Sequence, residues 1–184
     1  MVDRLKAVEG AGVADEKAPS VRELVERNLA AYRKAQECHD TVFGAACPYN
    51  FFPGPWVFRL DNVGLTRAEF EAEIRRFEEA CRRDDSSWDF EPWDPQEVVL
   101  GVGRVLILYE PDPPDRRGRS FYVADLRSED GEKFTAGEFL YQFYRAAAGD
   151  LRDSYHCHFE GLQFRGVAST PEGHVPIYQV SMGS

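Results

Sequence analysis

The sequence lacks the features that would place the chain in a membrane or in an oxidising compartment. No apolar run approaches the roughly 20 residues that a membrane-spanning helix requires. The first ten residues also lack the apolar stretch of a secretion signal. The cysteines contain no CxxC pair, so we expect free thiols in a cytoplasmic protein with no membrane partner. They are Cys38, Cys47, Cys81 and Cys157.

An excess of basic charge is missing as well. The chain has 32 acidic and 22 basic residues, which gives a formal net charge of −10. Such a surface repels the phosphates that a nucleic-acid-binding protein must neutralise, so we expect no nucleic-acid partner. Its densest arginine cluster, from Arg75 to Arg83, alternates with glutamates, as is typical of a solvent-exposed helix face. A negative surface instead favours association with a basic protein through electrostatic steering.

The common catalytic and nucleotide-binding motifs do not occur. The chain has no GxSxG, HExxH or P-loop sequence. The pair Gly101 and Gly103 lacks the third glycine and the following helix of a dinucleotide site. We therefore expect no cofactor, and enzymatic activity is not the first hypothesis.

Apolar residues are abundant. With 184 residues, 43% of them hydrophobic and 13% aromatic, the chain can bury a substantial core in one domain. Residues 1–19 mix glycine, alanine and charge without a sustained period, so we expect a flexible N-terminal arm. Residues 20–184 are predicted to form the single domain.

Three segments carry the Ser/Thr-x-x-Glu pattern of a helix capping box, in which the two side chains bond each other's backbone amides. They begin at Ser20, Thr66 and Thr135, and apolar residues follow each at helical spacing. We predict a helix over about 21–37 and one after each threonine. The second is the best specified, with Phe70, Ile74, Phe77 and Cys81 on one face.

Five segments have the alternation or the β-branched content of strands. They are residues 56–60, 98–110, 120–126, 155–164 and 175–182. In the second, Gly101 and Gly103 indicate a bulge or a close backbone approach. Because hairpins outnumber βαβ units, we predict an α+β fold: a mostly antiparallel sheet of about five strands with three amphipathic helices packed on it.

The first candidate site is an acidic, tryptophan-bearing segment. Tryptophans concentrate binding energy at protein interfaces, and neighbouring carboxylates would suit a basic partner. The alternative is that this loop folds over the core and seals it. The candidate partner-binding residues are Trp88, Trp93, Asp84, Asp85, Asp89, Glu91 and Asp94.

The second candidate site is a histidine-bearing strand. Alternation places His156, His158 and Glu160 on one face, where they could share a zinc ion. The alternative is two histidines on a half-exposed strand. A thiol nucleophile at Cys38, beside His39, would need a base from elsewhere in the fold, and a capped helix end is the simpler interpretation.

Two functions follow from these patterns. The first is a small protein-binding domain, of immunity or adaptor type, that engages a basic partner through the acidic tryptophan-bearing surface. The alternative is a metal-dependent hydrolase or small-ligand binder that uses the His156/His158 strand, with zinc as the possible cofactor. Either a monomer or a homodimer is compatible with the sequence.

Overall fold

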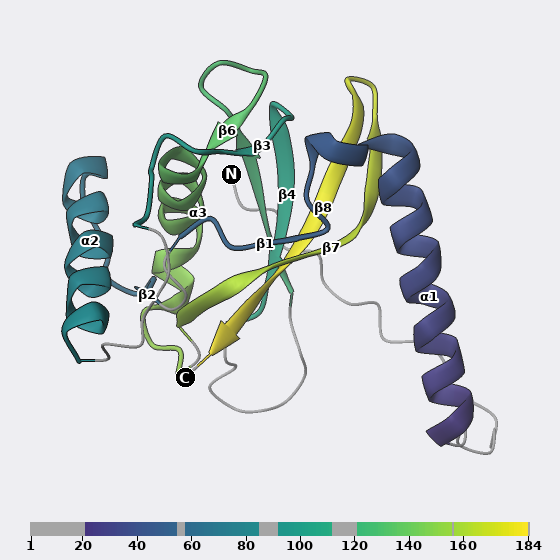
Figure 1. Cartoon of the computed structure of the whole chain (residues 1–184), viewed down its shortest axis with the longest axis horizontal. Helices are drawn as coiled ribbons and strands as arrows, with labels where there is room; N and C mark the ends of the chain where they lie inside the picture. Colours follow the sequence, from purple (N-terminus) through teal and green to yellow (C-terminus); the bar gives the residue numbers. More distant parts are fainter. Residues whose placement is uncertain (1–20, 55–57, 85–91, 112–120, 156, 184) are drawn as a thin grey trace.

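The computed structural model describes residues 21–54, 58–84, 92–111, 121–155 and 157–183. It has the predicted α+β architecture (Figure 1). The elements are α1 (Val21–Val42), η1 (Gly44–Ala46), β1 (Asn50–Phe51), β2 (Phe58–Arg59), α2 (Arg67–Asp84), β3 (Val98–Leu100), β4 (Arg104–Tyr109), β5 (Tyr122–Arg127), β6 (Phe134–Thr135), α3 (Ala136–Leu151), β7 (His158–Thr170) and β8 (Gly173–Gly183). The predicted arm 1–19 and the first capping serine, Ser20, lie outside the described residues.

The main sheet has the strand order β1-β7-β8-β4-β5, and β2 also pairs with β7. Its pairings are antiparallel except that of β4 with β8, which is parallel. Strands β3 and β6 form a separate small sheet. The predicted fold class, with a mostly antiparallel sheet, is confirmed.

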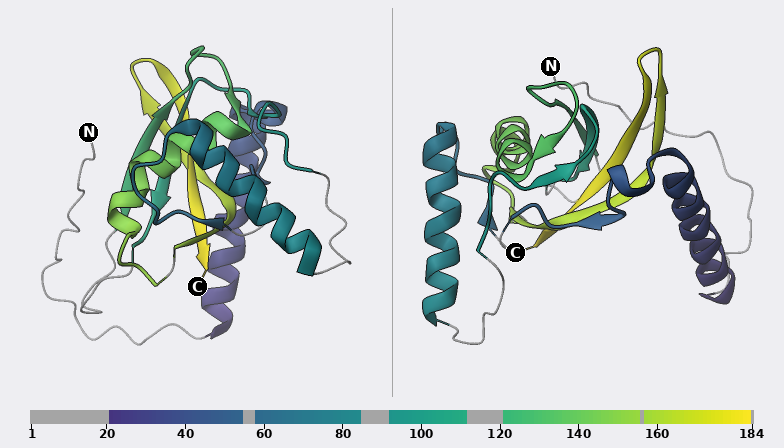
Figure 2. Two further views of the ribbon diagram at one scale, coloured as in Figure 1. Left: turned by 90° about the vertical axis from the view of Figure 1, so that its left-hand side faces the viewer. Right: turned by 45° about the horizontal axis from the view of Figure 1, so that its top comes forward.

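The three helices occupy different positions around this sheet. Helix α3 packs against β5 and β6, whereas α2 packs against α3. Helix α1 contacts β7 and stands at the opposite end of the molecule from α2, as the views in Figures 1 and 2 show. Helix α1 continues beyond the predicted residue 37 to Val42, and Gly44, with φ +51°, follows where the chain leaves the helix.

The segment 98–110 is not one continuous strand, so that prediction is wrong. It divides at the two glycines into β3 and β4, which belong to different sheets. The amide of Gly101 donates to the carbonyl of Ala46 at 2.6 Å. A Cβ on Gly103 would lie 1.9 Å from the carbonyl oxygen of Gly131. The close backbone approach predicted for these glycines is therefore confirmed, and it explains the break.

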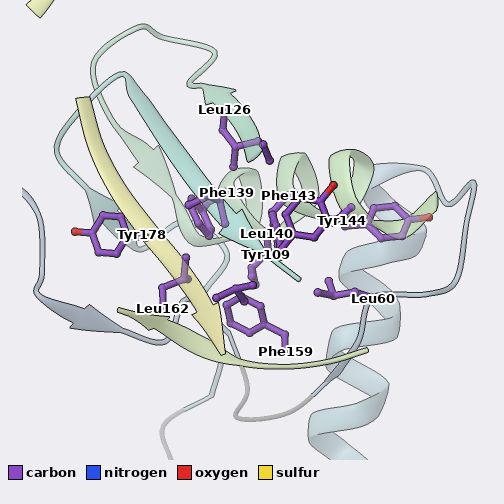
Figure 3. Packing of buried hydrophobic residues seen from close by; sticks show 14 of the residues in the cluster. Leu60, Tyr109, Leu126, Phe139, Leu140, Phe143, Tyr144, Phe159, Leu162 and Tyr178 are labelled. Carbon is purple, nitrogen blue, oxygen red and sulfur yellow. The ribbon is translucent and has the colours of Figure 1, made fainter. Parts of the chain in front are cut away.

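The core lies between α3 and the sheet. Figure 3 shows Tyr109, Phe143 and Phe159 packed together there, and all three are almost fully buried. The ring of Phe143 meets Tyr109 edge-on, with centroids 5.7 Å apart. The Tyr109 hydroxyl donates to the Asp150 carboxylate at 2.8 Å, which satisfies this buried polar group.

The terminal hairpin, β7–β8, is longer than predicted. Its register shifts by one residue at Glu160 and again at Arg165, so β7 carries two bulges. Gly161 follows the first bulge with φ +123°, and the ring of Phe52 covers it closely. A side chain at this position would collide with that ring.

No helix among the described residues is both long enough and apolar enough to cross a membrane.

Candidate functional site

Helix α2 is the element around which the candidate site is built. Its capping box is complete: the Thr66 amide donates to the Glu69 carboxylate at 2.8 Å, and the Glu69 amide donates to the Thr66 hydroxyl at 3.4 Å. These bonds start the helix at a defined residue. The same helix buries only Phe70, Ile74 and Glu78, so most of its surface stays accessible.

One flank of α2 borders a cleft of about 370 Å³, a volume typical of ligand sites, which run from roughly 300 to 1,000 Å³. The cleft lies between α2, the loop that precedes it and the side of α3. Its apolar lining consists of Leu65, Phe70, Ile74, Phe77 and Tyr144. Its polar lining consists of Arg59, Asp61, Asn62 and Glu73.

Tyr144 of α3 fixes the inner wall of this cleft. Its ring stacks on Phe70 with centroids 4.7 Å apart, and its hydroxyl oxygen accepts from the Leu65 amide at 2.7 Å. The hydroxyl of Tyr141 donates to the Leu65 carbonyl at 3.3 Å. Figure 3 places Tyr144 at the edge of the core, away from Tyr178. The cleft therefore has a rigid wall that is continuous with the core.

The polar rim of the cleft carries more negative than positive groups. Arg59 forms an ion pair with Asp61, whose side chain is 17% exposed. Glu73, at 48% exposed, bonds Arg76 on the outer surface of the helix at 2.5 Å. Of the residues that line the cleft, two are carboxylates and one is a cation. An apolar group with a neighbouring positive charge would complement this lining.

The other flank of α2 borders a shallow groove of about 430 Å³ that contains Trp93. The Trp93 amide donates to the buried Glu78 carboxylate at 3.0 Å, and its indole N–H donates to the Pro53 carbonyl at 2.9 Å. The guanidinium of Arg75 lies 6.0 Å from the ring centroid, within the range of a cation–π contact. Trp93 is thus half-buried and held in place by both of its N–H groups.

The predicted acidic segment is described only in part. Asp84 is the exposed last residue of α2, and Asp94 accepts from the Gln96 amide at 2.8 Å in a local turn. The remaining predicted contact residues, Asp85, Trp88, Asp89 and Glu91, lie outside the described residues. The groove beside Trp93 is charge-balanced, because two arginines and two glutamates line it.

Of the predicted metal ligands, His158 and Glu160 are described and His156 is not. Nδ1 of His158 is buried and has no hydrogen-bond partner among the described residues. Its cross-strand neighbour is Arg59 of β2. Glu160 occupies the first bulge of β7, with its carboxylate over Gly183. Within the described ranges, no group of three or more His, Cys, Asp or Glu side chains is arranged to hold a metal.

The histidine beside Cys38 has a structural role. His39 is 4% exposed, its Nε2 donates to the Cys47 carbonyl, and its Nδ1 lies 2.9 Å from the Asp40 carboxylate. Its ring meets Phe164 edge-on at 4.9 Å. These contacts attach the end of α1 to the sheet and occupy both ring nitrogens.

Three thiols are kept in their protonated form, those of the buried Cys47 and Cys157 and of the half-buried Cys81. Burial raises the pKa of Cys47 to about 11, against a weaker opposing hydrogen bond with Tyr178. Burial likewise raises the pKa of Cys157 and of Cys81. Because the thiolate is the reactive form, these three cysteines are poor nucleophiles.

Sequence reasoning identified one wall of the cleft and missed the cleft itself. The stripe Phe70, Ile74 and Phe77 was predicted as a buried helix face. Arg59 of β2 and Asp61 of the loop that follows it carried no signal, because only the fold brings them beside α2.

The chain matches no family model, no curated protein and no solved structure.

Proposed function

We propose that this protein is a cytoplasmic binding domain that engages a basic protein partner through the surface on both sides of α2. The observation that carries the proposal is the placement of α2 between two hollows, the apolar cleft and the Trp93 groove. A helix whose two flanks stay open offers apolar and aromatic contacts beside charged groups, which is the composition of protein interfaces.

The charge of the chain supports a basic partner. A net charge of −10 accelerates encounter with a positive surface and makes the association salt-sensitive. Asp84, the exposed last residue of α2, adds one carboxylate beside Arg82 and Arg83 of the last turn. This protein would then mask its partner, as an immunity protein does, or recruit it, as an adaptor protein does.

The test is to tag the protein, isolate it from its native cells at low and moderate salt, and identify the bound proteins by mass spectrometry. We expect a stoichiometric basic protein whose recovery falls as salt rises. Recombinant partner should then bind the purified chain, and a double charge reversal, Glu73→Lys with Glu79→Lys, should weaken that complex. Binding that is indifferent to both salt and this variant would contradict the proposal.

The second candidate is a metal-assisted hydrolase or small-ligand site on the His156/His158 strand. The specific observation in its favour is the buried Nδ1 of His158, which lacks a hydrogen-bond partner among the described residues. A zinc ion would coordinate the lone pair of this nitrogen. Zinc should then raise the melting temperature of the wild-type chain and of His174→Ala, but not of His158→Ala; an equal response of both variants would exclude this strand.

A further inference from the structure

We infer that the cleft beside α2 is an anchor pocket for a peptide segment of the partner in which a large apolar side chain lies next to an arginine or lysine. This inference rests on the proposed function and names the part of the partner that would be recognised. The apolar side chain would enter the cleft, and the cation would lie at its rim.

The apolar side chain of the partner is inferred from the lining of the cleft. Phe70, Ile74 and Tyr144 are almost fully buried, so they form a firm inner surface. Leu65 and Phe77 are only half-buried, and they line the open part of the cleft. A guest side chain would remove the remaining apolar surface of these two residues from water, which is the main source of affinity at such sites.

The cationic side chain of the partner is inferred from the rim of the cleft. Asp61 is the more enclosed carboxylate and already holds Arg59 in an ion pair. A carboxylate can accept hydrogen bonds at about four positions, so both Asp61 and Glu73 retain capacity for a second donor. Arg76, the arginine paired with Glu73, does not line the cleft, so the lining itself carries two carboxylates and one cation. An incoming cation therefore meets a rim with a net negative charge.

The wall of the pocket is in place before binding. The Leu65 backbone is bonded by two tyrosines of α3, and the complete capping box fixes the start of α2. A guest would therefore require little rearrangement, and little of the binding free energy would be spent on ordering the site.

The experiment uses the full chain and the acetylated, amidated tetrapeptide Gly-Arg-Leu-Gly as the probe. Binding is followed by amide chemical shifts in NMR spectra. Replacing the leucine of the probe by glycine should raise the dissociation constant about tenfold or more, because a buried leucine is lost. Replacing the arginine by glutamine should raise it about two- to fivefold, the effect of a partly exposed ion pair.

Three protein variants complete the test. Asn62→Trp, at an exposed position of the rim, should obstruct the cleft and abolish binding. Glu73→Lys should weaken binding of the arginine-containing probe and leave binding of the glutamine-containing probe unchanged. Glu37→Lys makes the same charge change at an exposed position of α1, at the opposite end of the molecule, and should bind like wild type. Circular dichroism establishes that each variant is folded.

Two outcomes would overturn the inference. One is probe binding that is insensitive to both Asn62→Trp and Glu73→Lys, because the contact would then lie outside the cleft. The other is the absence of any shift at cleft residues up to the solubility limit of the probe. In both cases a salt-sensitive basic partner could still be isolated, so the broader proposed function would stand or fall separately.

Discussion

Helices α2 and α3 begin with the same four-residue pattern and build different regions of the molecule. In α2 the glutamate of the pattern closes an exposed capping box on Thr66. In α3 the equivalent Glu138 is 6% exposed and bonds the Glu129 amide at 2.5 Å and the Gln142 side chain at 3.0 Å. Ten of the 16 residues of α3 are buried, but only three of the 18 in α2. Local sequence thus starts both helices, whereas the surrounding elements decide that α3 forms the core and α2 a surface.

The largest expected difference between the two regions concerns their phenylalanines. Phe143→Ala in α3 removes a fully buried ring from between Tyr109 and Phe159 and should reduce the free energy of unfolding by about 3–5 kcal/mol. Phe77→Ala in the half-exposed cleft wall should reduce it by about 1–2 kcal/mol. Urea denaturation of both variants measures the difference. Equal losses would mean that α2 is as much a part of the core as α3.

A smaller difference is expected between the two capping glutamates. Glu138→Ala leaves the partly buried Glu129 amide without its acceptor and should reduce the free energy of unfolding by about 1–3 kcal/mol. Glu69→Ala exposes its amide partner to water, which replaces the lost bond, so its effect should be the smaller one. Denaturation midpoints check the order, and the reverse order would refute the distinction drawn between the two capping boxes.

The smallest expected effect is an opposite pH dependence of the same two residues. Burial raises the pKa of Glu138, while the Thr66 hydroxyl and amide lower the pKa of Glu69. The stability that Glu138 contributes is therefore present below the ordinary glutamate value of 4.5 and is lost as pH rises through its raised pKa. The contribution of Glu69 is present above that value and is lost as pH falls through its lowered pKa.

Glutamine substitutions distinguish the two opposite pH dependences of stability. Relative to Glu138→Gln, the wild-type chain should lose stability as pH rises. Relative to Glu69→Gln, the wild-type chain should gain stability as pH rises through the acidic range in which free glutamate titrates. Denaturation of the three proteins at a series of pH values measures both differences. Slopes of the same sign would contradict the assigned hydrogen-bond environments.

Local patterns predicted the helix starts well because capping and apolar spacing are short-range properties. Thr66 and Thr135 both precede helices, and Gly103 marks the predicted close approach. What the sequence could not show depends on distant residues. The break between β3 and β4 needs Ala46 and Gly131, and the parallel pairing of β4 with β8 joins strands far apart in the chain.

The candidate site illustrates the same limit. The sequence directed attention to Trp93. It could not show that Glu78 and Pro53 hold this residue by hydrogen bonds. The cleft on the opposite flank of α2 combines residues 59–65 with Tyr144, and no local signal connects them. Patterns of residue type indicated that α2 has an apolar face, while the fold alone leaves part of that face open.

The most direct test of the account is native-state amide hydrogen exchange with and without the Gly-Arg-Leu-Gly probe. The amides of α3 should exchange at the rate set by global unfolding and should be unaffected by the probe. The amides of α2 should exchange faster in the free protein and should slow when the probe is added. Equal protection of the two helices together with no response of α2 to the probe would contradict the claim that α3 serves the core and α2 the binding surface.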